Sequence, residues 1–250
     1  MKKPVHFVGA GPGDPELITL KGRRLLDESD IVIYTGSLVP ATLLHGIKAE
    51  LYDSSGLTLD EIIDLMAEAW KDGKKIVRLH TGDPAIYGAI QEQMDALKRL
   101  DIPFDIVPGV SSVTAAAAAL ETELTIPDIS QTIIITRRKG RTPVPAGEDI
   151  RALARHQATM MILLSAGMME ETVNELIDGG YPADTPVAVI EKATWPEERI
   201  IKGRLDAISG LARAAGIEKT AIIAVGKVFG DKNYGKSKLY AKDFKHGHRK

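Results

Sequence analysis

Three glycines near the N-terminus are placed to bring the backbone against a ligand. Gly9, Gly11 and Gly13 follow the apolar residues 5–8, whose pattern predicts a first β-strand. The spacing departs from the dinucleotide fingerprint G-x-G-x-x-G, and Pro12 lies inside the loop. Because proline has no N–H donor, the loop is a poor phosphate cradle and suits the wall around a compact, uncharged part of a ligand. A glycine-rich turn without any ligand is the alternative interpretation.

Two later segments place polar residues directly after apolar runs. The segment 80–84, His-Thr-Gly-Asp-Pro, follows residues 76–79, and the segment 108–112, Pro-Gly-Val-Ser-Ser, follows residues 104–107. Asp83 can accept hydrogen bonds from the hydroxyl or amine groups of a ligand, or it can simply form the turn before a proline. The two serines can likewise cap a following helix. From these residues alone, both interpretations stay open.

Composition narrows the classes of function. The 250 residues are 44% hydrophobic and 26% charged, with a net charge of −2, which is ordinary for a globular protein and favours neither nucleic acid nor a membrane surface as a partner. The absence of cysteine removes disulfides, thiolate nucleophiles and zinc–thiolate sites, and it fits a cytoplasmic protein. The N-terminus does not resemble a secretory signal, and no apolar run approaches the length of a membrane span. No metal site is expected, because His6, His45 and His156 show no ligand spacing and His246 and His248 lie in a lysine-rich C-terminal segment that is more typical of a solvated tail.

Strand and helix patterns alternate along the chain, and they predict the elements that position the glycine-rich loop and the segments 80–84 and 108–112. In the first half, strands are expected at 5–8, 31–34, 76–79 and 104–107, and helices at 20–27, 59–70, 86–100 and 112–120. Repeated βα units predict a mostly parallel sheet with both faces covered. Ligands bind beyond the carboxyl ends of such strands, where the three segments above all fall.

The pattern restarts near residue 127. Strands are expected at 132–136, 159–164, 186–190, 199–202 and 221–225, and helices at 150–155, 168–178 and 205–214. We therefore predict an α/β fold of two α/β domains, 1–122 and 123–230, each a mostly parallel or mixed sheet flanked by helices. The basic residues 231–250 predict a partly disordered tail.

Three motifs together carry a family resemblance. GAGPGDP at 9–15, GDPAIYG at 82–88 and VPGVSS at 107–112 resemble the tetrapyrrole (corrin/porphyrin) methylases, and the likeness runs over nearly the whole chain before the tail. The resemblance implies S-adenosylmethionine as methyl donor, two α/β domains with the active-site cleft between them, a tetrapyrrole substrate with several carboxylates, and a homodimer.

Three further segments look like one branch of that family. YTGSLV at 34–39, TRRKGRTPVP at 136–145 and EKATWPEE at 191–198 are similar to the members that methylate C-11 of precorrin-4 or cobalt-precorrin-4 in cobalamin biosynthesis. Thr35 stands where the uroporphyrinogen-III methyltransferases carry an acidic residue, which argues against their activity here. Tyr34, Thr35 and Ser37 are candidates for lining the macrocycle.

The resemblance also implies the residues that contact the methyl donor. These nine residues are Pro12, Thr81, Gly82, Asp83, Ile86, Ser111, Ser112, Ala166 and Ala193. Ala166 and Ala193 are placed through loops of variable length.

No catalytic side chain is required by this chemistry. Methyl transfer from a sulfonium is an in-line displacement, which depends mainly on orientation and on the exclusion of water. His80 is a weak candidate for proton removal, and a polar wall residue without a proton role is the favoured alternative.

A basic loop is the candidate for the substrate carboxylates. Arg137, Arg138 and Arg141 surround Lys139 in the segment that two prolines stiffen. Guanidinium groups bind carboxylates in bidentate geometry, although a charge run is more often a solvated surface.

Trp195 has two interpretations that the sequence leaves open. It either shapes the site or packs in the interior.

Other functions compete with this one. A sister enzyme methylating another position of a corrin precursor would have the same fold and donor site. A protein- or RNA-modifying member of the superfamily is more distant, and an RNA substrate would predict a basic surface. A non-catalytic nucleotide-binding domain would bind the donor without turnover.

Overall fold

The computed structural model describes residues 3–230. It also describes six positions of the predicted tail, and the rest of 231–250 lies outside the described residues. The chain forms two compact units. The first comprises the residues up to Ala115 together with Ala193–Pro196, and the second comprises Ala116–Lys192 and the residues from Glu197 onward. The six tail positions are Gly235, Ser237, Ala241, Phe244, Lys245 and Gly247.

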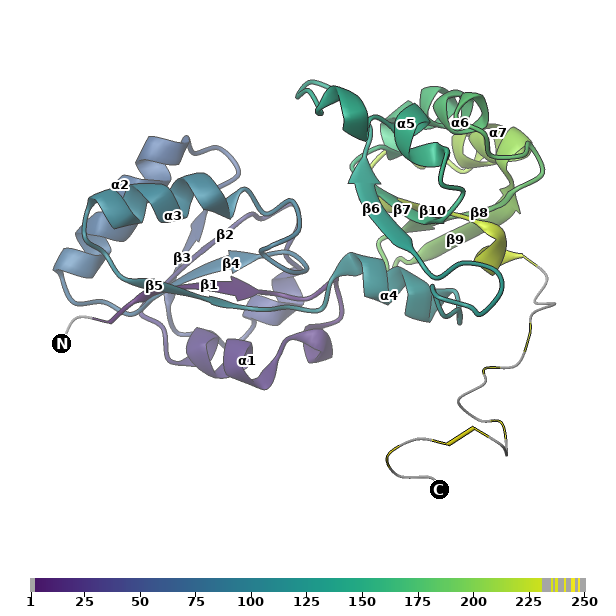
Figure 1. The fold of residues 1–250 in the computed structure, drawn as a ribbon. Coiled ribbons are helices and arrows are strands. Elements are labelled where there is room, and N and C mark those ends of the chain that lie inside the picture. The colour runs from purple at the N-terminus through teal and green to yellow at the C-terminus, as the bar shows by residue number, and fades with distance from the viewer. Residues whose placement is uncertain are drawn as a thin grey trace. The chain divides into compact units, whose positions relative to one another are not determined.

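The first unit is built on a five-stranded sheet in which all neighbouring strands are parallel, as the βα alternation predicts (Figure 1). The strand order is β3-β2-β4-β1-β5. The strands are β1 (Val5–Gly9), β2 (Ile31–Tyr34), β3 (Glu50–Asp53), β4 (Ile76–His80) and β5 (Phe104–Val107). The helices are α1 (Leu20–Asp27), α2 (Leu59–Lys71), α3 (Ile90–Arg99) and α4 (Ser112–Ala119), which continues into the second unit, with short 3₁₀ turns at Pro15–Leu17 and Ala41–Leu44.

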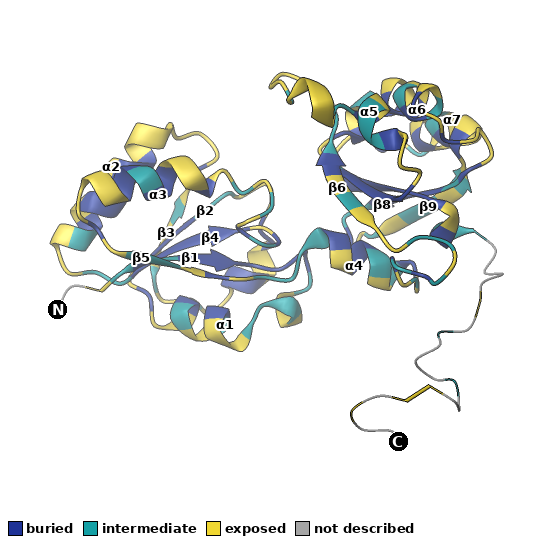
Figure 2. Cartoon of the chain, viewed as in Figure 1, coloured by how far each residue is buried: buried dark blue, intermediate teal, exposed yellow. Residues whose placement is uncertain are grey.

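Both faces of this sheet are covered, because side chains of one strand point alternately to the two faces. Phe7, Ile33 and Ile76 pack with the apolar residues of α2 and α3. Val8 and Leu79 pack on the other face with residues of α1 (Figure 1). The central strands are therefore almost wholly buried (Figure 2).

Local sequence signals explain where the helices begin. Thr19 accepts a hydrogen bond from the backbone N–H of Gly22 and caps α1, as its residue type predicts. Thr58 and Glu61 form a capping box at the start of α2.

Two elements differ from the sequence prediction. Strand β3 was not expected, because Glu50–Asp53 is a short and largely exposed edge strand without an apolar run. Helix α3 begins at Ile90 and not at residue 86. Tyr87 and Ala89 have positive φ, which ends the regular turn before the helix can start.

The second unit contains a mixed sheet with the order β6-β7-β10-β8-β9. Only the pair β6–β7 is parallel, and the other three pairs are antiparallel. Figure 1 shows α5, α6 and α7 together on one face of this sheet, and their apolar residues form a common core with β7, β8 and β10. The strands are β6 (Ile133–Arg137), β7 (Thr159–Leu163), β8 (Pro186–Glu191), β9 (Arg199–Arg204) and β10 (Ala221–Val225). The helices are α5 (Ile150–Ala154), α6 (Met169–Asp178) and α7 (Leu205–Ala214), with 3₁₀ turns at Ala146–Glu148, Ala166–Met168 and Lys227–Phe229.

The predicted fold class, two α/β sheets flanked by helices, is confirmed. In the described part of the chain, no helix is long and apolar enough to cross a membrane.

Candidate functional site

The loops that follow β1, β4 and β5 meet at the carboxyl end of the first sheet. These strands are neighbours in the order β4-β1-β5, so their ends lie at one edge. The backbone of Ala10 donates to the carbonyl of His80 at 2.7 Å. Gly11 and Gly82 then form an isolated antiparallel bridge, with N···O distances of 3.3 and 2.8 Å. We call residues 9–13, 81–83 and 108–112 the glycine rim.

The three loops of the rim contact one another through backbone atoms at Gly9, Gly82 and Gly109, at distances that only glycine allows. A Cβ atom on Gly109 would lie 2.1 Å from the carbonyl oxygen of Gly82, and one on Gly9 would lie 2.5 Å from the Cα of Gly109. Gly82 also has a φ of +60°. The three loops therefore cross at backbone distance, with no room for a side chain between them.

Asp83 ties two of these loops together. Its Oδ1 accepts from the backbone N–H of Ala85 at 2.8 Å, and its Oδ2 accepts from that of Gly109 at 3.0 Å. It is thus a turn former, one of the two interpretations open from the sequence. A carboxylate has about four acceptor positions, so two remain for a ligand.

The remaining expected donor contacts of the first unit lie along the same rim. Ser111 caps α4, since its Oγ accepts from the backbone N–H of Val113 at 3.2 Å. The site that a Cβ on Gly82 would occupy is 3.7 Å from the backbone nitrogen of Ser112. Thr81 is exposed, and Ile86 is half-buried in the turn that follows.

A short segment between β8 and β9 completes the rim. Ala193–Pro196 belongs to the first unit, although both flanking strands belong to the second. Trp195 donates its Nε1–H to the carbonyl of Pro12 at 2.8 Å. The backbone N–H of Asp14 donates to Thr194 Oγ1 at 3.0 Å. The sequence did not show this contact, although it had singled out Trp195, Pro12 and Ala193 separately.

His80 lies at the end of β4, and the residue is 8% exposed. It stacks on Phe7, and its Nε2 has no hydrogen-bond partner among the described residues. Burial, together with the positive charge of Arg78 two residues earlier, lowers the pKa of His80 to about 3. Arg78 is itself buried and bonds Gln93 and the carbonyl of Ile33, and desolvation lowers its pKa to about 10, so it stays charged. A buried, neutral imidazole is a poor proton acceptor, which favours the interpretation of His80 as a wall residue.

The candidates for lining the macrocycle lie at the end of β2 and directly after it, on the same edge of the sheet. Tyr34 and Thr35 are half-buried and Ser37 is exposed. Thr35 Oγ1 lies 3.4 Å from Ser54 Oγ. Asp53, at the end of β3, accepts from the backbone N–H of Gly36 at 3.0 Å.

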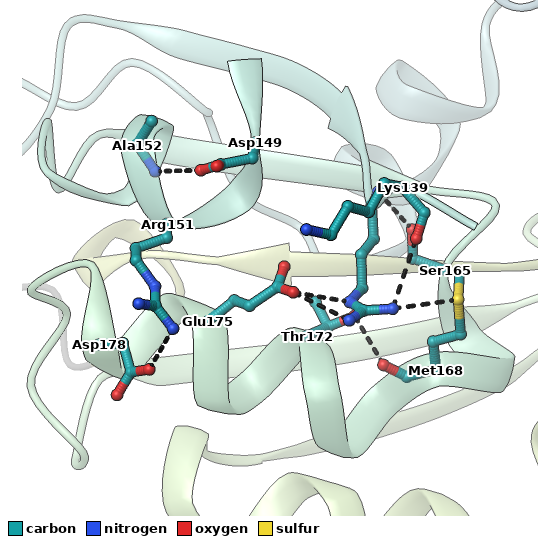
Figure 3. A network of polar contacts seen from close by, with 10 residues as sticks. Lys139, Asp149, Arg151, Ala152, Ser165, Met168, Thr172, Glu175 and Asp178 are labelled. Atoms are coloured by element: carbon teal, nitrogen blue, oxygen red, sulfur yellow. Dashed lines mark hydrogen bonds and ion pairs between the residues drawn. The ribbon is translucent and has the colours of Figure 1, made fainter. Parts of the chain in front are cut away.

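Of the three arginines of the basic loop, Arg137 and Arg138 form hydrogen bonds within the second unit. Arg138 pairs with Glu175 of α6 at 2.8 Å, and the two side chains are only 16% and 17% exposed. The same guanidinium contacts Met168 Sδ at 3.4 Å (Figure 3). Arg137 donates to the carbonyls of Thr142 and Pro143 at 3.2 and 2.7 Å. These bonds order the loop and give it a fixed shape.

Arg141 and Ala166 occupy different settings in that unit. Arg141 is exposed in the loop after β6. Ala166 is buried at the start of the turn after β7. Ser165 supports that turn. Its Oγ accepts from the backbone N–H of Arg138 at 2.9 Å (Figure 3), and it donates to the carbonyl of Leu163 at 2.7 Å.

The glycine rim can hold and orient a ligand through backbone atoms, small side chains and one carboxylate. Among the described residues no group of three or more His, Cys, Asp or Glu side chains could hold a metal ion.

Known proteins resemble this chain over nearly its full length. Residues 4–209 match the family model of the Tetrapyrrole (Corrin/Porphyrin) Methylases. The chain is 54% identical over 250 residues to a cobalt-precorrin-4 C(11)-methyltransferase from Methanocaldococcus jannaschii, covering 99% of this chain and 96% of that protein. It is 44% identical over 246 residues to a precorrin-4 C(11)-methyltransferase from Pseudomonas aeruginosa, covering 98% of each.

Solved structures are similar as well. A cobalt precorrin-4 methyltransferase, a cobalamin biosynthetic enzyme, superposes with a TM-score of 0.89 at 46% identity, covering 91% of this chain and 96% of that one. A uroporphyrin-III C-methyl transferase from Thermus thermophilus, complexed with S-adenosyl homocysteine, gives 0.78 at 29% identity, covering 95% and 99%.

The close backbone crossing predicts a large effect of one methyl group. Gly109→Ala should lower the free energy of unfolding by at least about 2 kcal/mol, because the new Cβ overlaps backbone atoms that cannot rotate away. Gly56→Ala is the control, since nothing lies within 4 Å of the added atom. Urea unfolding measures both variants, and equal stability for the two would contradict the crossing.

The low pKa of His80 predicts an acid-dependent loss of stability. The folded chain keeps His80 neutral down to about pH 3, whereas the unfolded chain binds a proton below its ordinary pKa of 6.5. Stability from this group is therefore present above pH 6.5 and declines as the pH falls toward 3. Between pH 7 and pH 5, the wild type should lose about 2 kcal/mol more than His80→Gln in urea unfolding. Equal losses would mean that His80 titrates normally in the folded state.

Proposed function

Since the chain belongs to the tetrapyrrole (corrin/porphyrin) methylase family, we propose that it is an S-adenosylmethionine-dependent methyltransferase that methylates C-11 of precorrin-4 or cobalt-precorrin-4 in cobalamin biosynthesis. The observation that carries this proposal is the end-to-end similarity to enzymes named for that reaction, at 54% and 44% identity. Thr35 supports the same choice, because it stands where the uroporphyrinogen-III methyltransferases carry an acidic residue.

The donor supplies an electrophilic methyl group on a sulfonium, and the macrocycle supplies the nucleophilic carbon. The chain has to align the two and keep water away from them. Backbone loops that cross without side chains between them are rigid, so they can hold a ligand with little loss of conformational freedom. His80 has no proton role in this scheme.

The glycine rim fits the donor. Asp83 has acceptor positions left for ribose hydroxyls or the donor's amine, and Thr81 is exposed beside it. Pro12, Gly82 and Ala193 offer backbone and small apolar surfaces that suit an adenosyl group. Ile86, Ser111, Ser112 and, from the second unit, Ala166 remain the other proposed contacts.

The macrocycle is proposed to bind along the residues after β2 and through the basic loop. Tyr34, Thr35 and Ser37 offer hydroxyl groups at the first position. In the loop, Arg141 is the arginine whose side chain is most exposed, whereas Arg137 and Arg138 first hold the loop in shape. All three remain candidates for contact with substrate carboxylates.

The test of the function is the position of the new methyl group. The chain, incubated with methyl-labelled S-adenosylmethionine and precorrin-4, should yield a product labelled at C-11, located by NMR. The same reaction with cobalt-precorrin-4 distinguishes the two forms of substrate. Label at another ring position would indicate a sister enzyme, and donor binding without any product would indicate a non-catalytic domain.

Asp83 provides a test of the donor site. Asp83→Ala should weaken S-adenosylmethionine binding by about 1–3 kcal/mol, since it removes the link to Gly109 as well as a ligand acceptor. Asp83→Asn keeps the shape and one carbonyl acceptor, so its loss should be smaller. Calorimetry measures both, and an unchanged dissociation constant in both variants would remove Asp83 from the site.

The arginines should separate into binding and support roles. Arg141→Ala should weaken macrocycle binding about tenfold or more, as expected for one charge-assisted hydrogen bond, and should leave donor affinity unchanged. Arg138→Ala should lower the free energy of unfolding, whatever its effect on macrocycle binding. The reason is that the carboxylate of Glu175, which is mostly buried, would lose its partner. Arg151→Ala is the control, since that residue forms an exposed pair with Asp178 (Figure 3). If none of the loop variants changes macrocycle binding, the loop is a solvated surface.

Homodimer formation and a cytoplasmic location stay predictions. Light scattering at micromolar concentration measures the first.

A further inference from the structure

Trp195 is one of only two tryptophans in the chain, and the function proposed above does not use it. Its indole N–H donates to the carbonyl of Pro12 at 2.8 Å, across 183 positions of sequence. One residue earlier, Thr194 accepts from the backbone of Asp14 at 3.0 Å. Two successive residues of one segment therefore bond two alternate residues of the loop after β1.

The loop is also shaped to receive the indole. A Cβ on Gly13 would lie 2.2 Å from Trp195 Cδ1 and 2.6 Å from Nε1, so the indole occupies the space where a side chain at this position would begin. Gly13 has no positive φ, which means that its backbone does not itself require glycine. What requires glycine at this position is contact with the tryptophan.

The same loop is also held by the rest of the rim. Gly11 is bridged to Gly82, and the next residue, Pro12, is buried. Without Trp195, the loop would keep its bonds to the β4 loop and the bond from Asp14 to Thr194, but it would lose the indole contact at Pro12 and Gly13. Pro12, which accepts the hydrogen bond, and Ala193, two residues before Trp195, are both proposed donor contacts.

We propose that Trp195 is a positioning residue for the methyl donor: it fixes the loop of Pro12 and Gly13 in its binding conformation without itself taking part in the chemistry. This inference rests on the proposed function for the identity of the ligand. It assigns the tryptophan of the segment 191–198 to the donor and not to the macrocycle.

The chain offers a matched control in Trp70. Its Nε1–H also donates to a backbone carbonyl, that of Lys3, at 2.9 Å, and both indoles are half-buried. Lys3 lies before β1, at the opposite end of that strand from the glycine rim. Trp195→Phe and Trp70→Phe therefore delete the same kind of hydrogen bond, one at the rim and one away from it.

The experiment is calorimetric titration of the full chain with S-adenosylhomocysteine. Trp195→Phe should raise the dissociation constant about three- to tenfold, the effect of one hydrogen bond, and Trp70→Phe should leave it within twofold of the wild type. In steady-state assays, Trp195→Phe should raise KM for the donor and leave KM for the macrocycle unchanged. Equal donor affinity in Trp195→Phe and the wild type would overturn the inference.

A double-mutant cycle tests the contact with Gly13. Gly13→Ala should weaken S-adenosylhomocysteine binding in the wild type, and it should have less than a twofold effect in a Trp195→Ala background, where space for the methyl group exists. Additive effects would show that the two positions act separately, and would overturn the inference.

A measurement without ligand separates this inference from the proposed function. Hydrogen exchange of the peptide that spans residues 10–16 should be faster in Trp195→Phe than in Trp70→Phe, because the loop has lost one of its two hydrogen bonds to residues 194 and 195. If the wild type fails to bind S-adenosylhomocysteine, the proposed function fails, while the exchange rates still report on the loop. Unchanged exchange in Trp195→Phe would overturn the positioning role whatever the ligand.

Discussion

The crossing of three backbone loops at Gly9, Gly82 and Gly109 is the constraint on which the glycine rim depends. The loops can approach this closely only because none of the three positions carries a Cβ. The bridge between Gly11 and Gly82, the bond from Gly109 to Asp83 and the position of the α4 N-terminus against Gly82 all follow from that approach. A parallel sheet brings strand ends to one edge, but these glycines turn that edge into a fixed surface.

The charged side chains near the candidate sites serve structure before they serve a ligand. Asp83 is occupied by two backbone N–H groups, Arg138 by Glu175, and Arg137 by carbonyls of its own loop. Such bonds hold a side chain in one rotamer, which is the condition for presenting its remaining hydrogen-bonding capacity in a defined direction. The enzyme proposed here would thus achieve catalysis through a rigid frame, consistent with a reaction whose nucleophile and leaving group both belong to bound molecules.

Local periodicity was enough to predict most of the fold, and it failed where structure depends on distant partners. The apolar strands β1, β2, β4 and β5 and the capped helix α1 have clear signals of their own, whereas β3 is an exposed edge strand whose four residues show no pattern. The start of α3 was misplaced because the backbone at Tyr87 and Ala89 is set by the loop and not by residue type. The three-loop rim could be predicted from the strand ends. The contact of Trp195 with Gly13 could not be predicted, because no local sequence pattern indicates it and the two residues are 182 positions apart. The engagement of Arg138 by Glu175 escaped prediction for the same reason.

The return of Ala193–Pro196 to the first unit has a consequence for the order in which the protein is made. Pro12 leaves the ribosome early, but its partner Trp195 follows 183 positions later. At a synthesis rate of roughly 5–20 residues per second, the loop after β1 waits on the order of ten to forty seconds for its second partner. The sheet of the first unit can form in that interval from its own strands, with the loop supported on one side only. Binding competence is then acquired only after Trp195 has been made, so a nascent chain that stalls before residue 193 would fold its first sheet and yet carry an unfinished site.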